Sequence, residues 1–434
     1  MEIRVPYGQT HLTVEVAPHR LQGIVCANDV GIGDEDETLA RALGSPFGSP
    51  ELGRFLAGAR GLAVLVNDGT RPTPTARVLG HIRRDLERVS DLRLVVATGA
   101  HVPPTEGELR RIFGDLLDVW RDRIVAHDAR RVDDLVPVGS TPRGTEVVLN
   151  RRVASAERVL VVGSVEPHYF AGYTGGRKSI LPGVAARGTI EQNHRHALSP
   201  AARPRALGGN PVHEDMVDAV RLLDERSIFS IQTVLDADGR IYSATAGDIH
   251  ESFYAAAAKA QDVYSVEIRR KADVVVAVAQ PPLDVNLYQA HKAIEHAKLA
   301  LNDGGALILV AECRGGVGDD AFLAALRGAS EGRPSVPMLG KDGDLGPSSA
   351  GAATYLLGHH KAAQIADLAT WAEVIAVTSL DESLFPRAFV RACPDLQRAL
   401  DAALAARGRD AKVLFLMAAT TVVPCVVPGP LTRE

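Results

Sequence analysis

The sequence predicts an α/β protein of two domains, each built on a mainly parallel sheet, around an interdomain cleft. Two observations carry this prediction. Short aliphatic runs of strand length alternate with amphipathic segments of helix length, which is the pattern of βαβ units. The chain has 434 residues, more than the roughly 100 to 200 of a typical domain, so two hydrophobic cores are expected.

The first domain is expected to span residues 1–265. Aliphatic runs predict its strands, and a hairpin with an Asp-Gly turn precedes an alanine-rich connector helix. The predicted strands are 62–66, 92–97, 145–149, 158–162, 229–235 and 241–244, and the predicted helices are 75–88, 106–113, 210–224 and 250–264.

The second domain is expected to span residues 266–410. Its predicted strands are 272–279, 306–310 and 374–377, and its predicted helices begin near Leu287 and cover 396–407. Residues 332–349 are rich in Gly, Pro, Ser and Asp, which is typical of a loop or lid. The apolar run 412–423 is suited to a central strand. The sequence leaves open whether residues 411–434 return to the first domain or complete the second.

Composition excludes several classes of protein. The net charge is -5 and 23% of the residues are charged, so no basic surface points to nucleic acid. The four cysteines show no Cys-x-x-Cys spacing, which favours free thiols in a reducing compartment. The start of the sequence lacks a basic segment followed by an apolar core, and no run of about 18 apolar residues occurs. We therefore expect a cytoplasmic protein with neither nucleic acid nor a membrane as partner.

The segment from His168 to His196 is the strongest candidate for chemistry. It contains Pro-His168-Tyr-Phe-Ala-Gly-Tyr-Thr-Gly-Gly-Arg-Lys178-Ser and, further on, Gln-Asn-His194-Arg-His196. Imidazoles and a primary amine therefore surround a glycine-rich turn that is neither a regular helix nor a strand.

Two polar loops upstream have a similar character. Asp68-Gly-Thr-Arg71-Pro follows the predicted strand 62–66, and Thr-Gly-Ala-His101 follows 92–97. Polar loops at the carboxyl ends of parallel strands are where open α/β sheets bind ligands. Asp68 could simply cap the next helix, but a cap does not need Arg71. The forked guanidinium of Arg71 is suited to a substrate carboxylate.

The glycine-rich turn comes close to the P-loop pattern Gly-x-x-x-x-Gly-Lys-Ser/Thr, whose amides bind phosphate. Arg177 stands where that pattern requires glycine, and Pro182 falls within what should be the first turn of the following helix. A nucleoside-triphosphate site is therefore disfavoured. Looser contact of the Gly175 and Gly176 amides with a phosphate group is expected.

His101 and His168 are candidates for proton transfer, because histidine titrates near neutral pH. They follow different strands of one predicted sheet, so they could face one another across a cleft. An enzyme that inverts a stereocentre needs an acid or base on each face of its substrate, and such a pair would provide them. The alternative for His168 is a histidine that only caps a loop.

His194 is the candidate metal ligand. His194 and His196 point the same way only in a strand, and the residues around them predict a helix or loop, so one ligand is favoured over a two-histidine chelate. In the second domain Gln289 and Lys292 share a helix face, and a solvated amphipathic face is the alternative there. The other histidines are expected to be surface or structural residues.

Together these motifs resemble the nickel-pincer lactate racemase family, strongly over residues 1–314 and more weakly beyond. The resemblance implies an isomerase, a racemase or 2-epimerase of a 2-hydroxy acid. It also implies a nickel-pincer nucleotide (pyridinium-3,5-bisthiocarboxylic acid mononucleotide nickel) as cofactor and the enzymes that synthesise it as partners. The features shared with the family, in order, are Asp68-Gly-Thr-Arg71-Pro, Thr98-Gly-Ala-His101, His168 with Lys178, Gln-Asn-His194, Gly209-Asn-Pro-Val-His and Gln289-Ala-His-Lys292.

The resemblance implies a role for each of these residues. His101 and His168 correspond to an acid/base pair that handles the hydroxyl proton, while a hydride moves to the cofactor and returns to the other face of a flat 2-oxo acid. His194 corresponds to the protein ligand of nickel, and Lys178 to a lysine that contacts or tethers the cofactor. The remaining implied roles are cofactor binding for Asp68 and substrate binding for Arg71, Gln289 and Lys292.

The chain departs from the family in the second domain. Lactate racemases carry a tryptophan near the substrate, whereas Ser348 and Ser349 stand at the corresponding place before His359 and His360. A smaller residue enlarges the pocket, so we expect a 2-hydroxy acid other than lactate.

Other functions are less well supported by the sequence. A non-catalytic carrier of the nickel nucleotide is the main alternative, and the retained acid/base histidines argue against it. A hydrolytic metal site would show clustered carboxylates, which the motifs lack. The dinucleotide pattern Gly-x-Gly-x-x-Gly after a first strand is missing, so an ordinary dehydrogenase is rejected.

Overall fold

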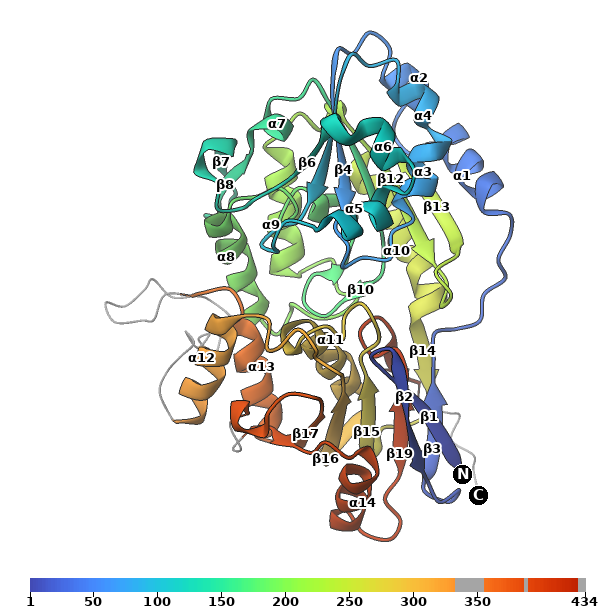
Figure 1. Ribbon diagram of the computed structural model, residues 1–434, viewed down its shortest axis with the longest axis vertical. Helices are drawn as coiled ribbons and strands as arrows, with labels where there is room; N and C mark the ends of the chain where they lie inside the picture. The colour runs from blue at the N-terminus through green and yellow to red at the C-terminus, as the bar shows by residue number, and fades with distance from the viewer. Residues whose placement is uncertain (332–354, 386–388, 428–434) are drawn as a thin grey trace. The chain divides into compact units, whose positions relative to one another are not determined.

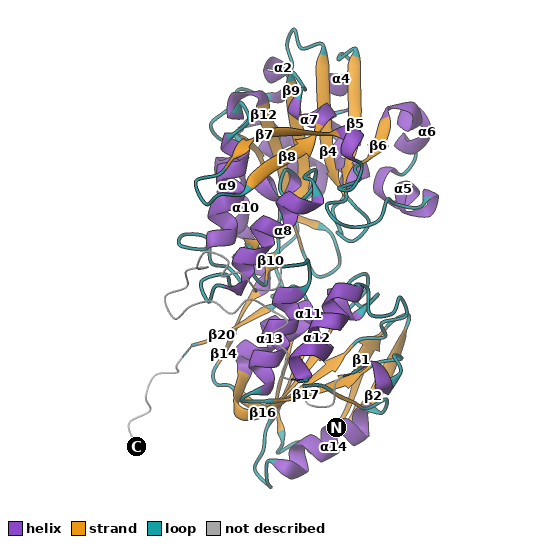
Figure 2. Ribbon diagram, turned by 90° about the vertical axis from the view of Figure 1, so that its left-hand side faces the viewer, coloured by secondary structure: helices purple, strands orange, loops and turns teal. Residues whose placement is uncertain are grey.

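The computed structural model describes residues 1–331, 355–385 and 389–427. It contains two compact α/β units (Figure 1). The first unit consists of Asp29–Ala197 and Ala201–Val263, and the second consists of Met1–Asn28, Leu198–Pro200 and the chain from Tyr264 onward. The expected α/β class is confirmed, and Figure 2 shows helices alongside the strands of each unit. The loop or lid expected at 332–349 lies outside the described residues.

A six-stranded sheet forms the centre of the first unit. Its strand order is β13-β12-β9-β4-β5-β6, and every neighbouring pair is parallel except β12 with β13, which is the predicted hairpin. Residues 62–66 of β4 are all buried, as expected for a central parallel strand with both faces covered. The strands are β4 (Gly61–Asn67), β5 (Asp91–Ala97), β6 (Ile124–Ala126), β9 (Arg158–Ser164), β12 (Ile228–Leu235) and β13 (Ile241–Gly247).

Helices of the first unit bury apolar side chains against this sheet. Leu39, Leu79 and Phe113 come from three different helices and belong to the same hydrophobic cluster as alternate residues of β4 and β5. Full burial of each such side chain contributes roughly 1.5 to 3 kcal/mol. The helices are α1 (Glu35–Gly44), α2 (Leu52–Phe55), α3 (Thr75–His81), α4 (Arg83–Leu86), α5 (Glu106–Phe113), α6 (Leu116–Trp120), α7 (Arg151–Ala154), α8 (Arg187–Arg195), α9 (Pro211–Arg221) and α10 (Ile249–Tyr264).

The strand predicted at 145–149 lies outside the central sheet. It forms β8 (Glu146–Asn150) and pairs antiparallel with β7 (Leu135–Ser140) in a separate two-stranded sheet. A tight turn sets this pairing, since Thr141 N donates to Thr145 O at 3.0 Å and Gly144 N donates to Thr141 O at 2.9 Å. Local turn geometry therefore replaces the parallel pairing that the alternation of strands and helices suggested.

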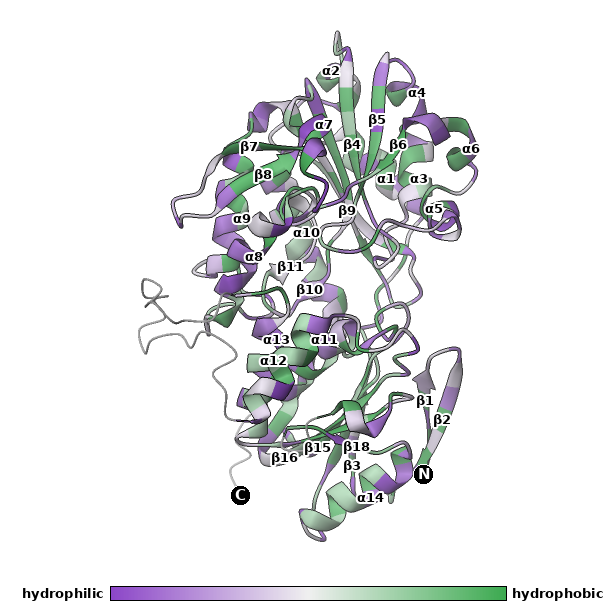
Figure 3. Ribbon diagram, turned by 60° about the vertical axis from the view of Figure 1, so that its left-hand side comes forward, coloured by the Kyte–Doolittle hydropathy of each residue, from purple (hydrophilic) through white to green (hydrophobic). Residues whose placement is uncertain are grey.

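A second six-stranded sheet forms the centre of the second unit. Its strand order is β18-β17-β16-β15-β19-β3, and every neighbouring pair is parallel. Figure 3 shows that β15 and β16 are mainly hydrophobic along their length. The strands are β3 (Leu21–Val25), β15 (Ala272–Val278), β16 (Leu301–Val310), β17 (Glu373–Val377), β18 (Arg391–Ala392) and β19 (Val413–Leu416).

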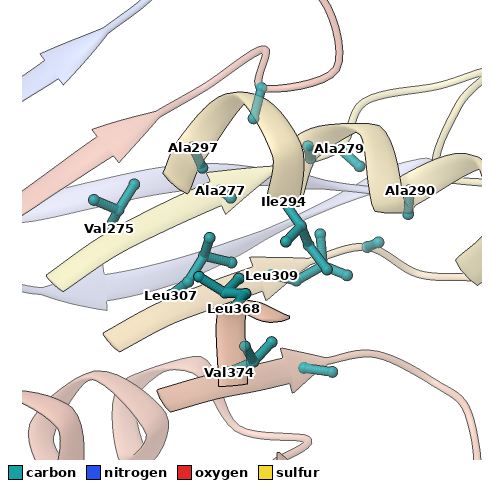
Figure 4. Packing of buried hydrophobic residues seen from close by; sticks show 14 of the residues in the cluster. Val275, Ala277, Ala279, Ala290, Ile294, Ala297, Leu307, Leu309, Leu368 and Val374 are labelled. Atoms are coloured by element: carbon teal, nitrogen blue, oxygen red, sulfur yellow. The ribbon is translucent and has the colours of Figure 1, made fainter. Parts of the chain in front are cut away.

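Both faces of the second sheet are covered. On one face Ile294 packs with Leu307, Leu309 and Leu368 (Figure 4). The hairpin β1 (Glu2–Tyr7) and β2 (Thr10–Glu15) contributes Val5 and other side chains to the cluster on the other face. The helices are α11 (Leu287–Ala297), α12 (Asp320–Ser330) and α13 (His359–Ala369), which belong to the first cluster, and α14 (Leu396–Ala406), which belongs to the second.

The ends of the chain differ from the expected domain boundaries. The boundary expected near residue 265 lies where the chain passes into the second unit. Residues 1–28, expected in the first domain, belong to the second unit because β3 pairs with β19 at the edge of its sheet. The strand predicted at 412–423 does not return to the first unit, because it forms β19 between β15 and β3. The last strand, β20 (Val423–Val426), pairs with β14 (Ser265–Ile268).

Among the described residues, no helix has both the length and the apolar character that are needed to cross a membrane.

Candidate active site

The carboxyl ends of three neighbouring parallel strands meet at one edge of the first unit's sheet. β9, β4 and β5 are adjacent. Asp68 directly follows β4, His101 lies four residues after β5, and His168 lies four residues after β9 in the short strand β10 (Pro167–His168). The fold therefore brings these three predicted residues to one edge, which is where open α/β sheets bind ligands.

Asp68 and His101 form a hydrogen-bonded pair. Nδ1 of His101 lies 2.7 Å from Oδ2 of Asp68, and Oδ1 accepts hydrogen bonds from N and Oγ1 of Thr70 at 3.1 and 2.6 Å. Burial raises the pKa of Asp68, but the charge and hydrogen bond of His101, the Thr70 hydrogen bond and the Arg71 charge together lower this pKa to about 2. The ionised carboxylate holds a proton on Nδ1 of His101, so Nε2 is unprotonated in the neutral ring.

His168 has the opposite arrangement. Its side chain is buried, and its Nδ1 accepts a hydrogen bond from Ala171 N at 3.3 Å. A ring nitrogen that accepts an N–H bond carries no proton, so the neutral ring carries its proton on Nε2. In their neutral forms His101 and His168 therefore carry their protons on opposite ring nitrogens. Neutral His101 can accept a proton at Nε2, and His168 presents an N–H at that position.

The ring of Phe170 connects three of the predicted residues. Its centroid lies 4.6 Å from that of His168 and 4.9 Å from that of His194, both in edge-on arrangements. Nζ of Lys178 lies 5.3 Å from the same ring centroid. His168, Lys178 and His194 are therefore gathered around one aromatic side chain, which the sequence reasoning did not single out. Its only signal was its place two residues after His168.

Lys178 lies in a short 3-10 turn, Gly176–Ser179, and not at the start of an α-helix, in keeping with the mismatch to the P-loop. Gly175 and Gly176 have φ values of +79° and +51°, which favour glycine. The Gly176 amide donates to Oε1 of Gln232 at 3.0 Å. This amide is therefore already engaged, and the expected phosphate contact would have to come from other donors of the turn.

Arg177 replaces the P-loop glycine and has a structural task in the turn. Its guanidinium is fully buried and donates to the carbonyl oxygens of Ala171, Gly175 and Thr174 at 2.7, 3.2 and 3.4 Å. The guanidinium carbon also lies 4.1 Å from the centroid of the Phe253 ring. Burial lowers the pKa of Arg177 to about 9.

His194 lies near the end of α8 and is buried. Its Nδ1 lies 3.2 Å from Oδ1 of Asn193. His196 follows in the turn His196–Leu198, and two residues so spaced on a helical path project in nearly opposite directions. The described residues contain no group of three or more His, Cys, Asp or Glu side chains that could hold a metal ion. One imidazole, an amine and an aromatic ring fit a cofactor that brings its own metal donors.

Arg71 lies in the same loop as Asp68. Its backbone N–H donates to Asp68 O at 3.2 Å, and its side chain is partly buried. A guanidinium at the sheet edge that carries both histidines is suited to bind a carboxylate.

Gln289 and Lys292 lie on α11 in the second unit. Nζ of Lys292 donates to Oε1 of Gln289 at 2.7 Å, and both side chains are buried. The alternative prediction, that Gln289 and Lys292 lie on a solvent-exposed face of their helix, is therefore wrong.

A buried cation on α13 was missed in the sequence. Nζ of Lys361 lies 4.2 Å from the Tyr288 ring centroid, and burial lowers its pKa to about 7, although the charges of Glu295 and Asp319 act in the opposite direction. His359 and His360, directly before it, are also buried. The signal available in the sequence was the run Gly-His-His-Lys at a helix start.

Buried neutral histidines predict sensitivity to acid. Burial, together with the charges of Arg177 and His250, lowers the pKa of His213 from 6.5 to about 3. Below pH 6.5 the unfolded chain binds a proton that the folded protein excludes, so the free energy of unfolding should fall by roughly 1.4 kcal/mol per pH unit between pH 6.5 and 3. Urea unfolding at pH 7 and pH 5 measures this loss. His213→Gln should lessen the pH dependence, and an unchanged dependence would contradict the assignment.

The two-unit α/β fold, with polar residues at the carboxyl ends of its parallel strands, belongs to the class in which α/β enzymes bind their ligands. A family model for the lactate racemase N-terminal domain matches residues 7–204, and one for the lactate racemase C-terminal domain matches residues 267–423. The chain belongs to the lactate racemase family. This membership confirms the expected isomerase class.

Individual relatives agree with this assignment. The lactate racemase of Lactiplantibacillus plantarum is 30% identical over 431 residues, which is 95% of this chain and 97% of that protein. The lactate racemase of Thermoanaerobacterium thermosaccharolyticum is 31% identical over 330 residues, 74% of this chain and 76% of that protein. The apoprotein structure of a lactate racemase from the latter organism matches with a TM-score of 0.85 at 28% identity, covering 98% of this chain and 100% of that one. A Thermotoga maritima protein shares the fold, with a TM-score of 0.67 at 16% identity over 91% of this chain and 99% of that one.

Proposed function

We propose that the protein catalyses racemisation or 2-epimerisation of a 2-hydroxy acid with a nickel-pincer nucleotide. The observation that carries this proposal is the pair of histidines with opposite tautomers, His101 and His168, at one sheet edge. One histidine that can accept a proton at Nε2 and one that presents an N–H there suit a reaction that handles a hydroxyl proton on either face of its substrate.

His194 and Lys178 would hold the cofactor. His194 offers a neutral imidazole nitrogen to nickel, and Lys178 offers an amine near the same Phe170 ring. When bound there, the nickel-pincer nucleotide supplies reversible acceptance of the hydride from C2 of the substrate. Arg71 would orient the substrate by a forked hydrogen bond to its carboxylate.

The chain's own residues would manage the hydroxyl proton. Nε2 of His101 is unprotonated in the neutral ring and takes the hydroxyl proton of one enantiomer, which leaves His101 as an imidazolium. The opposite enantiomer forms when His168, in its imidazolium form, returns a proton to the oxygen and becomes neutral. The cycle therefore starts with His168 charged and His101 neutral and ends with the charges exchanged, which is what the reverse reaction requires.

A panel of single-enantiomer 2-hydroxy acids tests the function. The holoprotein should racemise at least one acid of the panel, and deuterium placed at C2 should be kept in the product. Rapid loss of the label to water would instead indicate carbanion chemistry. The expectation of a substrate other than lactate depends on Ser348 and Ser349, which lie outside the described residues. The panel tests it directly, since turnover of lactate alone would overturn it.

The carrier alternative has a distinct outcome. A carrier would bind the cofactor and release it to another protein without turning over any acid of the panel. The Asp68–His101 pair argues against a carrier, because a buried carboxylate that fixes a histidine tautomer has no task in storage.

Asp68→Asn tests the positioning of His101. The amide can offer its NH₂ group to Nδ1 and so favour the wrong tautomer, and we expect kcat to fall by about 10²-fold or more. The KM should stay near the wild-type value, since it does not depend on the tautomer, and the nickel content shows whether Asp68 also takes part in cofactor binding. Thr70→Ala removes only one donor to Asp68 and should cost less. An Asp68→Asn protein with wild-type kcat would refute the positioning role.

A further inference from the structure

We propose that a buried network behind α8 fixes the orientation and tautomer of His194, with Asn193 as the positioning residue and Asp215 as its anchor. This inference rests on the proposed role of His194 as nickel ligand. Asn193 and Asp215 are both fully buried, at 0% exposure, so their hydrogen bonds must be made within the protein.

The direction of the Asn193 amide is fixed by its partners. Nδ2 of Asn193 donates to Oδ2 of Asp215 at 2.8 Å and to Val212 O at 3.3 Å. A carbonyl oxygen only accepts hydrogen bonds, so the NH₂ group must face this side and Oδ1 must face His194. Oδ1 then accepts from Nδ1 of His194 at 3.2 Å.

The tautomer of His194 follows from this direction. An amide oxygen cannot donate, so Nδ1 of His194 carries the proton, and a neutral imidazole has only one. Nε2 is therefore left with its lone pair, which is the form that binds a metal. Metal-ligating histidines usually donate their second N–H to a fixed acceptor, which sets the ring and its basicity. Here that acceptor is the adjacent side chain of the same helix.

Asp215 is held by elements far apart in sequence. It lies on α9, and its carboxylate oxygens accept hydrogen bonds from Oγ1 of Thr141 at 2.5 Å and Oγ1 of Thr145 at 2.9 Å. These two threonines flank the turn that joins β7 and β8. The turn of the two-stranded sheet β7-β8 therefore holds in place the carboxylate that orients Asn193.

The Phe170 ring restrains His194 from another element. Its edge-on contact with His194, at 4.9 Å between centroids, comes from the loop after β10. The His194 ring is therefore held by a hydrogen bond at Nδ1 and by the contact with the Phe170 ring. If the network served only to satisfy buried polar groups, its last hydrogen bond would not have to be made to His194, the proposed nickel ligand.

The first test is the tautomer of His194 in the apoprotein. Nitrogen-15 NMR of imidazole-labelled protein, with His194→Gln to assign the signals, should show His194 with its proton on Nδ1. Asn193→Leu keeps a similar shape and removes the acceptor, so this preference should be lost. A wild-type His194 with its proton on Nε2 would overturn the proposal, whatever the variant does.

The second test is nickel retention by the holoprotein under challenge with a chelator. Asn193→Leu should retain nickel 10- to 100-fold less tightly than wild type, the usual range for lost support of a ligand. Asn150→Leu is the matched control, because Asn150 is also buried and its Nδ2 lies 3.2 Å from Nδ1 of another buried histidine, His127. It should lose stability and keep wild-type nickel affinity.

The outcomes separate this inference from the proposed function. Equal nickel affinity in Asn193→Leu and wild type, with His194→Ala strongly impaired, would overturn the positioning role alone. Wild-type nickel affinity in His194→Ala would overturn the ligand assignment itself. Thr145→Val, which removes one donor to Asp215, gives a milder variant and should weaken nickel retention in the same direction.

Discussion

Replacing His168 with alanine is expected to lower kcat for racemisation by about 10²- to 10⁴-fold, the usual worth of a positioned acid or base. The imidazole is buried and its Nδ1 accepts a hydrogen bond from the Ala171 N–H, so we place the proposed proton exchange with the substrate at Nε2. Chiral chromatography of the product measures the loss. Nickel content should remain near the wild-type value, because His168 is not among the residues proposed to hold the cofactor.

The two enantiomers should distinguish His168 from His101. If each histidine serves one face, His168→Ala should slow formation of the 2-oxo acid from one enantiomer more than from the other. His101→Ala should show the reverse preference. Acid quenching after a single turnover, followed by trapping of the 2-oxo acid, measures both rates. Equal losses for both enantiomers in both variants would contradict the assignment of one histidine to each face.

Much of the first unit could be predicted because its signals are local. The strands near 62–66, 92–97 and 158–162 are mainly aliphatic runs, and the structure has them as parallel strands whose aliphatic side chains are mostly buried. The helix predicted at 106–113 is α5, which begins at a capping box formed by Thr105 and Glu108. Polar loops after such strands then place Asp68, His101 and His168 at one edge without any knowledge of tertiary contacts.

What could not be predicted depends on contacts between distant residues. Residues 1–28 join the second unit through an edge strand, β3, whose pairing partner lies almost 400 positions later. The sequence of a short strand does not indicate which distant strand it pairs with. The Phe170 ring and the Asn193 amide lie within motifs that the sequence singled out, but the sequence does not reveal what either side chain does, since a buried phenylalanine and a helical asparagine are usually structural.

The sequence left open the surroundings of the polar residues of the second unit. Gln289 and Lys292 share a helix face with a spacing that suits either solvent or a site, and the structure buries both. Periodicity reports which residues share a face and not what covers that face. For that reason the run from His359 to Lys361 was also not recognised as buried.

Arg177→Met is expected to lower the free energy of unfolding by roughly 1 to 3 kcal/mol. The buried guanidinium donates to three backbone carbonyl oxygens of the segment 171–175, and a methionine would remove this donor from all three. Ala171 O and Gly175 O keep the backbone donors Tyr173 N and Lys178 N, so the loss falls mainly on Thr174 O and on the order of the turn, while relief from burying a charge offsets part of it. Urea unfolding measures the change.

Lysine at position 177 should not rescue the protein. A single ammonium cannot reproduce the forked geometry that reaches carbonyls of Ala171, Thr174 and Gly175. Arg93→Met, at an exposed ion pair with Asp91, is the control and should change stability by less than about 0.5 kcal/mol.

The turn also couples stability to the proposed chemistry. Ala171 O accepts from Arg177 and Ala171 N donates to His168, so the peptide planes on either side of Ala171 connect the buried cation to the imidazole that we propose as catalytic. Arg177→Met should therefore lower kcat even at temperatures where the protein remains folded, whereas Arg93→Met should not. A variant that lost stability and kept full kcat would show that the turn supports the fold without positioning His168.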